Sequence, residues 1–309
     1  MAPDLSSQNI CFIGGGNMAA AIISGLVATS FSSSKSQIHV SEPWDVNRNK
    51  MAALGVRTTS SNAEAATGAN ILILAVKPQV AKEVCQELAG VWSGASSADK
   101  GAEEPQAKRA KVEGEGELPL VVSIAAGITA ESLRKWCTTS DGRTPPVVRV
   151  MPNTPALLGE GASGLFAGAE VSSEQKDQVT ALLGSVSKTT EWVEKEELLD
   201  VVTGLSGSGP AYFFAMVEHL ITAATKLGLS EEQATRLAKQ TCLGAGKMLV
   251  EADAETTPSQ LRRNVTSPKG TTEAALKSFE ASGFEAIVDK AVKAATDRGE
   301  ELGRTLGEM

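Results

Sequence analysis

Five short runs of apolar residues, each closed by Gly, Pro, Asn or Ser, punctuate the first half of this 309-residue chain. The runs are rich in β-branched side chains and contain almost no polar residue. Such strands are typical of a parallel sheet covered by helices, because neither face of the sheet meets water. Since the runs alternate with helical patterns, they predict a doubly wound, mostly parallel α/β domain. The predicted strands are residues 10–13, 38–40, 71–76, 120–124 and 147–151.

Two changes of composition divide the chain further. Residues 93–119 hold Gly, Ala, Ser and charged residues with almost no large apolar side chain, so we predict a disordered insertion there. After residue 195 the strand patterns stop and helical patterns take over. We therefore expect an α/β domain over residues 1–195 and an all-helical domain over residues 196–309.

Helix start and stop signals mark this second half. Residues 209–228 open with Gly-Pro and close on Gly, as a helix with Pro in its first turn does. Residues 230–233 and 257–260 each predict a capping box at the start of a further helix. A last helix is expected from about residue 284 toward residue 304.

The helix predicted after Pro210 is apolar around most of its circumference. A helix of this kind is expected to be buried on nearly every side. A helical domain of this size has little room for it, so we expect a second copy of the chain to complete the burial. The apolar positions are Phe213, Phe214, Met216, Val217, Leu220 and Ile221.

The sharpest local signal is a glycine-rich turn directly after the first predicted strand and before an apolar helix. In this pattern Gly14 permits the tight turn, Gly16 lets the backbone approach a pyrophosphate, and Ala19 replaces a third glycine. The free N–H groups and positive dipole end of the helix then favour phosphate. This context predicts a dinucleotide-binding site.

The end of the second strand bears on which nicotinamide cofactor binds. A carboxylate there favours NAD by accepting the ribose 2′-OH, whereas a hydroxyl with a nearby Arg accommodates the 2′-phosphate of NADP. Ser41 and Arg48 point to NADP, and Glu42 points to NAD. We predict NADPH, with NADH as the open alternative.

Other loops qualify as ligand contacts by their position. Residues 75–78 and 125–127 follow predicted strands, at the sheet edge where open α/β folds bind ligands. Lys77 fits a ligand contact and an ordinary solvated lysine equally well. Residues 204–210 and 264–272 are glycine- and hydroxyl-rich turns before helices, which suit a carboxylate or phosphate. Together with the dinucleotide turn they predict a substrate pocket between the domains.

Charge and reactive-residue content narrow the function. The net charge is −8, which argues against a nucleic-acid binder. The two histidines, His39 and His219, lie far apart, so we expect no multi-His metal site. The four cysteines form no CxxC pair, and no stretch approaches the length of a membrane span, so we expect a cytoplasmic protein with reduced thiols.

Seven longer motifs follow one another along the chain: FIGGGNMAAAIISGL, LAVKPQV, SIAAG, RVMPNTPA, GLSGSGPAYFF, GAGKML and NVTSPKGTTEAAL. Together and in this order they resemble pyrroline-5-carboxylate reductase, the last enzyme of proline biosynthesis. The resemblance implies a Rossmann domain followed by an all-helical, substrate-binding domain that intertwines in a homodimer and often assembles into larger rings. It covers essentially the whole chain except residues 93–119.

The resemblance also implies site residues. Those that match contacts to the dinucleotide are Ile13, Gly14, Gly15, Gly16, Asn17, Met18, Ser41, Asn62, Ala75, Val76, Lys77, Pro78, Ile124, Ala125 and Ala126. Those that match the loops closing over proline or pyrroline-5-carboxylate are Glu255, Asn264, Val265, Ser267, Gly270, Thr271 and Thr272.

The reaction implied is hydride transfer from the nicotinamide to the C=N carbon of a cyclic imine that carries a carboxylate. The substrate carboxylate is expected at backbone N–H groups of the 267–272 loop, with the Thr272 hydroxyl at the ring nitrogen as the catalytic contact. Lys269 departs from the family, where Gly is usual. If this position needs a positive φ, Lys strains it by about 1–2 kcal/mol; otherwise it is harmless and adds positive potential near the carboxylate.

Two other functions stay open at this point. A two-domain dehydrogenase of the β-hydroxyacid type would use a helical-domain lysine, for which Lys239 and Lys247 are candidates, but no glycine-rich motif surrounds either. A non-catalytic NADP-binding sensor would not need the second set of loops.

Overall fold

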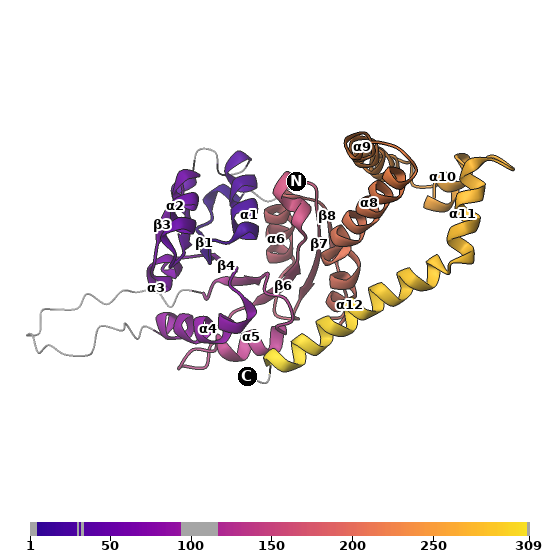
Figure 1. Ribbon diagram of the computed structural model, residues 1–309. Helices are drawn as coiled ribbons and strands as arrows, with labels where there is room; N and C mark the ends of the chain where they lie inside the picture. The colour runs from indigo at the N-terminus through magenta and orange to yellow at the C-terminus, as the bar shows by residue number, and fades with distance from the viewer. Residues whose placement is uncertain (1–4, 30, 32–33, 94–116, 308–309) are drawn as a thin grey trace, which may run out of the picture. The chain divides into compact units, whose positions relative to one another are not determined.

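The computed structural model describes residues 5–29, 31, 34–93 and 117–307 (Figure 1). Most of the predicted insertion, residues 94–116, lies outside the described residues. Contacts divide the chain into two compact units, Met1–Gly207 with Thr296–Met309, and Ser208–Ala295. The domain boundary after residue 195 stays a prediction, since it rests on where strand patterns stop.

The first unit is built on one eight-stranded sheet with the order β3-β2-β1-β4-β5-β6-β7-β8. The pairs from β3 to β6 are parallel, β7 is antiparallel to β6, and β8 is parallel to β7. This is the mostly parallel Rossmann-type sheet predicted from the apolar runs. The strands are β1 Ile10–Ile13, β2 Ile38–Ser41, β3 Arg57–Thr59, β4 Ile71–Leu74, β5 Leu120–Ser123, β6 Val147–Met151, β7 Gly161–Ala167 and β8 Ser187–Trp192.

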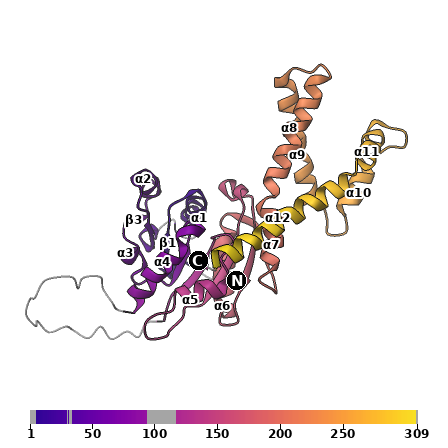
Figure 2. The ribbon, with the colours of Figure 1, turned by 60° about the horizontal axis from the view of Figure 1, so that its bottom comes forward.

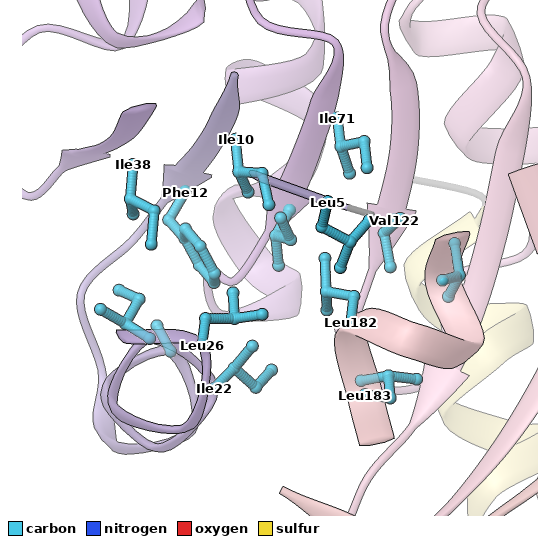
Figure 3. Close-up of a cluster of buried hydrophobic side chains, with 14 of the residues drawn as sticks. Leu5, Ile10, Phe12, Ile22, Leu26, Ile38, Ile71, Val122, Leu182 and Leu183 are labelled. Atoms are coloured by element: carbon cyan, nitrogen blue, oxygen red, sulfur yellow. The ribbon is translucent and has the colours of Figure 1, made fainter. Parts of the chain in front are cut away.

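Successive side chains of each strand point to opposite faces of the sheet. Since those of the five predicted strands are mostly apolar, both faces are apolar, and helices cover both of them. Ile10 and Phe12 of β1 join one buried cluster with residues of α1 and α6 (Figure 3). Cys11 and Ile13 join another with residues of α3, α4 and α5. Each large side chain fully buried in this way stabilises the fold by about 1.5–3 kcal/mol. The α-helices of this unit are α1 Asn17–Ala28, α2 Asp45–Ala53, α3 Asn62–Ala66, α4 Pro78–Trp92, α5 Ala130–Trp136, α6 Ser173–Gly184 and α7 Leu198–Val202.

Three strands were not predicted from the sequence. β3 and β8 are the edges of the sheet and carry mostly polar side chains, and β7 is rich in glycine, so none of them forms an apolar run. Two predicted strands are also shorter than expected, since β4 ends at Leu74 and β5 at Ser123. The residues that follow, Ala75 and Ile124, belong to the loops that line the sheet edge.

The second unit is helical, as predicted. The structure has α8 Gly209–Lys226, α9 Glu231–Val250, α10 Pro258–Asn264 and α11 Thr271–Ala281, while α12 Phe284–Gly307 begins here and ends in the first unit. α8 and α9 lie side by side (Figure 2). Ser230 and Gln233 form the predicted capping box of α9.

One capping prediction is half wrong. The Thr257 hydroxyl accepts the Gln260 N–H at the start of α10, as expected. The Gln260 side chain does not return the bond: its Nε2 donates to Asn264 Oδ1, and its Oε1 accepts from Arg263. Two helical partners within one turn hold the amide away from the cap.

α8 keeps much of its apolar surface exposed in a single chain. Phe213 is 63% exposed and Phe214 is 69% exposed, although both are large aromatic side chains. Apolar faces of this kind mark protein–protein contacts. The apolar pattern of α8 predicts burial on nearly every side, and a single chain does not bury these side chains.

Candidate active site

Four strands of the sheet end at one level. Ile13 at the end of β1 pairs with Ser41 of β2 and with Leu74 of β4, and Leu74 pairs with Ser123 of β5. The loops that leave these strands therefore start side by side. β1 and β4 flank the point where the strand order reverses, which is where open α/β sheets bind ligands.

The glycine turn fits tightly against the loop after β4. Gly14 has φ +102°, and its N–H donates to Ser41 O at 2.8 Å. A Cβ at Gly14 would lie 2.6 Å from Ala75 O. Both the backbone conformation and the contact require a residue without a side chain.

Gly16 has a different reason to be glycine. It caps α1 with extended backbone angles, φ −73° and ψ −178°, and a Cβ there would meet no protein atom within 4 Å. The space in front of Gly16 is therefore open. Asn17 and Met18 begin α1 beside it, where N–H groups have no acceptor within the helix.

This open cradle fits a pyrophosphate. The N–H groups of the first turn and the positive end of the α1 dipole point at the space that Gly16 leaves free. A nicotinamide dinucleotide is the kind of ligand that fits, and Gly16, Asn17 and Met18 are the residues that would hold its phosphates.

Side chains link the end of β2 to the start of α3. Ser41 is buried, and its hydroxyl donates to Asn62 Oδ1 at 2.7 Å, while Asn62 Nδ2 donates to Glu87 Oε2 at 2.7 Å. The structure thus brings two residues predicted from separate segments, Ser41 and Asn62, into direct contact.

Glu42 faces the glycine turn. Its side chain is buried, its Oε2 accepts the Gly15 N–H at 2.7 Å, and its Oε1 accepts the Trp44 N–H at 3.0 Å. The sequence could not show these contacts, because Glu42 and Gly15 are 27 residues apart. The acid that pointed to NAD is bonded to the protein backbone.

Arg48 borders the same turn from α2. Its Nη1 donates to the carbonyl oxygens of Glu42 and Pro43, at 2.8 and 3.1 Å, and its Nη2 pairs with Asp45. The Arg48 side chain is 25% exposed and that of Asp45 is 79% exposed. Arg48 therefore sets a partly accessible positive charge at the end of β2.

The remaining predicted cofactor residues line the loops after β4 and β5. Ala75 N–H donates to Ile13 O at 2.8 Å, and Ile124 N–H donates to Leu74 O at 3.1 Å, which extends the sheet pattern into both loops. Lys77 is exposed and caps α4, and Pro78 opens that helix. Val76, Ala125 and Ala126 complete these loops.

Two motifs singled out in the sequence are tied to each other. Asn153 is buried, its Nδ2 donates to Ser206 O at 3.1 Å, and its Oδ1 accepts the Ala162 N–H at 2.9 Å. Ser206 lies in a π-helical turn, Thr203–Gly207, that leads toward α8. Asn153 therefore has a structural task within the first unit.

The predicted substrate residues lie in the second unit, and all but Glu255 fall between the last residue of α10 and the first turn of α11. Asn264 ends α10, Val265 follows it, and Ser267 O accepts the Gly270 N–H at 3.0 Å. Gly270 caps α11 with no side chain, so the N–H groups of Thr271 and Thr272 point out of the helix start. A carboxylate fits this position by charge and by hydrogen bonding.

Glu255 lies apart from this group. It belongs to the loop before α10, whereas Asn264 ends that helix. Seven helical residues rise by about 10 Å, so the two side chains start from opposite ends of α10. The other predicted substrate residues all fall within the nine-residue stretch from Asn264 to Thr272.

Lys269 adopts φ +59°, and among the described residues it is the one non-glycine with a positive φ. Position 269 therefore has the positive φ at which a lysine is strained, and Lys269 carries a strain of about 1–2 kcal/mol. Its N–H donates to Glu273 Oε2 at 2.8 Å, and this bond, more than the nearby Lys277, holds the pKa of the Glu273 carboxyl below its usual value.

We expect Lys269→Gly to raise the free energy of unfolding by about 1 kcal/mol, because glycine adopts this φ without strain. Urea denaturation measures the change. Lys269→Ala is the matched control, since it removes the charge but keeps the Cβ, and it should bring no gain. An equal gain from both variants would trace the effect to charge instead of backbone strain.

Within the described part of the chain, no group of three His, Cys, Asp or Glu side chains is placed to hold a metal ion. The four cysteines are free thiols. None of the helices in the same residues is long and apolar enough to span a bilayer.

Family models match both parts of the chain. The model described as "Pyrroline-5-carboxylate reductase dimerisation" matches residues 196–302. The model described as "NADP oxidoreductase coenzyme F420-dependent" matches residues 9–99. The helical region thus resembles domains that mediate self-association.

Curated relatives and solved structures cover nearly the whole chain. Pyrroline-5-carboxylate reductase from Pseudomonas aeruginosa is 46% identical over 305 residues, 98% of this chain and 100% of the relative, and that from Haemophilus influenzae is 40% identical, over 95% and 97%. The structure of a pyrroline-5-carboxylate reductase from Coxiella burnetii has a TM-score of 0.82 at 38% identity, covering 96% of this chain and 98% of that one. A pyrroline carboxylate reductase from Plasmodium falciparum, solved with NADP bound, has a TM-score of 0.75 at 29% identity, over 96% and 99%.

Proposed function

The chain belongs to the pyrroline-5-carboxylate reductase family, and we propose that it reduces the C=N bond of 1-pyrroline-5-carboxylate with NADPH to give L-proline. The observation that carries this proposal is that one chain has both an open cradle for a pyrophosphate at Gly16 and, at the start of α11, free N–H groups that suit a carboxylate. Both features are needed for a reductase that takes a dinucleotide and an anionic imine.

In this reaction the bound nicotinamide supplies the hydride. The protonated imine is already electrophilic, so the protein has to orient it more than to acidify it. We assign the substrate carboxylate to the N–H groups of Thr271 and Thr272, and the ring nitrogen to the Thr272 hydroxyl. A threonine hydroxyl is a weak acid, so Thr272 orients the ring and water is the final proton donor.

NADPH oxidation at 340 nm with 1-pyrroline-5-carboxylate tests the proposed reaction. Turnover with formation of proline is the expected result. The two other functions weighed from the sequence are not favoured, because the chain matches reductases over nearly its full length. Tight NADPH binding without turnover would nevertheless support the sensor and contradict the reductase.

Arg48 is the residue to which we assign the preference for NADPH. A 2′-phosphate can take the place of Asp45 beside the guanidinium and gains a charge-assisted bond. We expect Arg48→Ala to raise the KM for NADPH by roughly 30-fold, about 2 kcal/mol, and to change that for NADH much less.

Asp45→Asn is the matched variant for Arg48→Ala, and it should change the KM for NADPH in the opposite direction. It removes a carboxylate that repels the 2′-phosphate, so the KM for NADPH should fall by about two- to fivefold. Steady-state kinetics with both cofactors measures these changes. Equal effects of Arg48→Ala on NADPH and NADH would remove Arg48 from cofactor discrimination.

The chain self-associates through its dimerisation domain, and we propose a homodimer that assembles further into a ring. The exposed aromatic side chains of α8 support the dimer.

We expect Phe214→Glu to raise the dissociation constant of the dimer by at least 100-fold, since a charge would be buried in an apolar contact. Sedimentation analysis reports the mass, and Leu158→Glu, outside that domain and also at an exposed leucine, should leave it unchanged.

We also propose a cytoplasmic location. The free state of Cys11, Cys85, Cys137 and Cys242 supports it, because thiols stay reduced in that compartment.

A further inference from the structure

The turn after β2 contains a buried carboxylate that the proposed reaction does not use. The Glu42 residue is 7% exposed, and both of its carboxylate oxygens accept backbone N–H groups, from Gly15 at 2.7 Å and from Trp44 at 3.0 Å. A carboxylate is stable at such burial when donors of this kind replace its water. The two bonds join the phosphate-binding turn to the turn after β2.

The glycine turn also packs on the stem of this side chain. A Cβ at Gly15 would lie 3.2 Å from both Cβ and Cγ of Glu42, so the backbone rests directly on it. Gly15 is itself buried. If Glu42 swung toward a ligand, the Gly15 N–H would lose its acceptor in a buried place, which is costly.

We propose that Glu42 is a positioning residue of the phosphate-binding turn and not a ligand of the adenosine ribose. The inference rests on the proposed function, because it concerns the same dinucleotide site. An acid at this place in NAD enzymes accepts the ribose 2′-OH. Here the carboxylate fixes Gly15 and Trp44 instead, so it serves NADPH and NADH alike and leaves their discrimination to Arg48.

Glu42→Gln tests the role of the carboxylate at nearly constant volume. The amide offers one acceptor oxygen, so one of the two N–H groups loses its partner. The KM for NADPH and the KM for NADH should both rise by about tenfold, equal to about 1.4 kcal/mol, while kcat and the ratio of the two constants stay within about twofold. Glu64→Gln is the matched control. It makes the same substitution at a carboxylate that also accepts a hydrogen bond, from the Thr59 hydroxyl at 2.6 Å, but whose side chain is largely exposed.

A second measurement uses the unaltered protein and so does not depend on how the variant folds. Calorimetry compares the binding of ADP with that of 2′-deoxy-ADP. If Glu42 accepted the 2′-OH, the deoxy nucleotide would bind about tenfold or more weakly, as expected for a hydrogen bond to a charged group. We expect the two affinities to agree within about twofold.

Three results would overturn the inference. The first is a rise in the KM for NADH alone in Glu42→Gln, and the second is an unchanged KM for both cofactors in that variant. The third is weaker binding of 2′-deoxy-ADP than of ADP to the unaltered protein. Because ADP binding requires no imine, normal binding without reductase turnover would contradict the proposed reaction and leave the role of Glu42 standing.

Discussion

Gly14→Ala is expected to lower the free energy of unfolding by about 3 kcal/mol and to abolish measurable NADPH binding. A residue with a Cβ at φ +102° costs roughly 1–2 kcal/mol, and the contact with Ala75 O at 2.6 Å adds overpacking of roughly 1–3 kcal/mol. The carbonyl belongs to the backbone, so it cannot rotate away as a side chain would. Denaturant unfolding and calorimetric titration with NADPH measure the two effects.

Gly16→Ala is the matched variant, because it adds the same methyl group two residues later. The φ of Gly16 suits alanine, and no protein atom lies within 4 Å of the new Cβ. The unfolding midpoint should therefore stay unchanged, while the methyl group enters the space for the pyrophosphate. We expect the Kd for NADPH to rise roughly 100-fold, about 2.7 kcal/mol. Loss of stability in Gly16→Ala, or normal NADPH binding by either variant, would contradict this account of the turn.

The second large effect is expected at Thr272. Thr272→Ala should lower kcat roughly 100-fold, since it removes the hydrogen bond we assign to the ring nitrogen of the imine. The KM for NADPH should stay within about twofold, because Thr272 lies in the second unit and the dinucleotide residues all lie in the first. Steady-state kinetics with saturating NADPH separates the two constants.

Two further variants make the Thr272 test specific. Thr272→Ser keeps the hydroxyl and should recover kcat to within about tenfold of the original enzyme. Thr266→Ala removes a hydroxyl from the same loop, one that donates to Arg262 O. It should leave kcat nearly unchanged. A kcat for Thr272→Ala equal to that of the original enzyme would exclude the hydroxyl from the reaction.

The predictable part of this fold follows from burial. The five apolar strands lie in the interior of the sheet, where both faces are covered, so their sequences carry a clear pattern. The edge strands β3 and β8 meet solvent and need no such pattern, and glycine-rich β7 shows none. Edge position therefore hid β3 and β8, and glycine content hid β7, which lies between β6 and β8.

The candidate site divides in the same way. Local turns were predictable, because the tight turn at Gly14 and the capping of α9 depend on neighbouring residues. The bond between Glu42 and Gly15 was not, since it joins residues 27 positions apart, and no pattern records which way a carboxylate turns. The resemblance supplied the remaining contacts residue by residue, and they stay predictions until the variants are measured.

The four strands β1, β2, β4 and β5 end at residues that pair with one another, and this has a consequence for how such an enzyme can evolve. Ile13, Ser41, Leu74 and Ser123 are held by ladder pairing, and the residues that we expect to touch a ligand in this unit lie at these strand ends or in the segments beyond them. The ladder hydrogen bonds of these strands therefore involve no side chain of the loops. A lineage can exchange the short turn between Ser41 and Arg48, which holds the residue to which we assign the preferred nucleotide, while the strands that carry the turn are inherited unaltered.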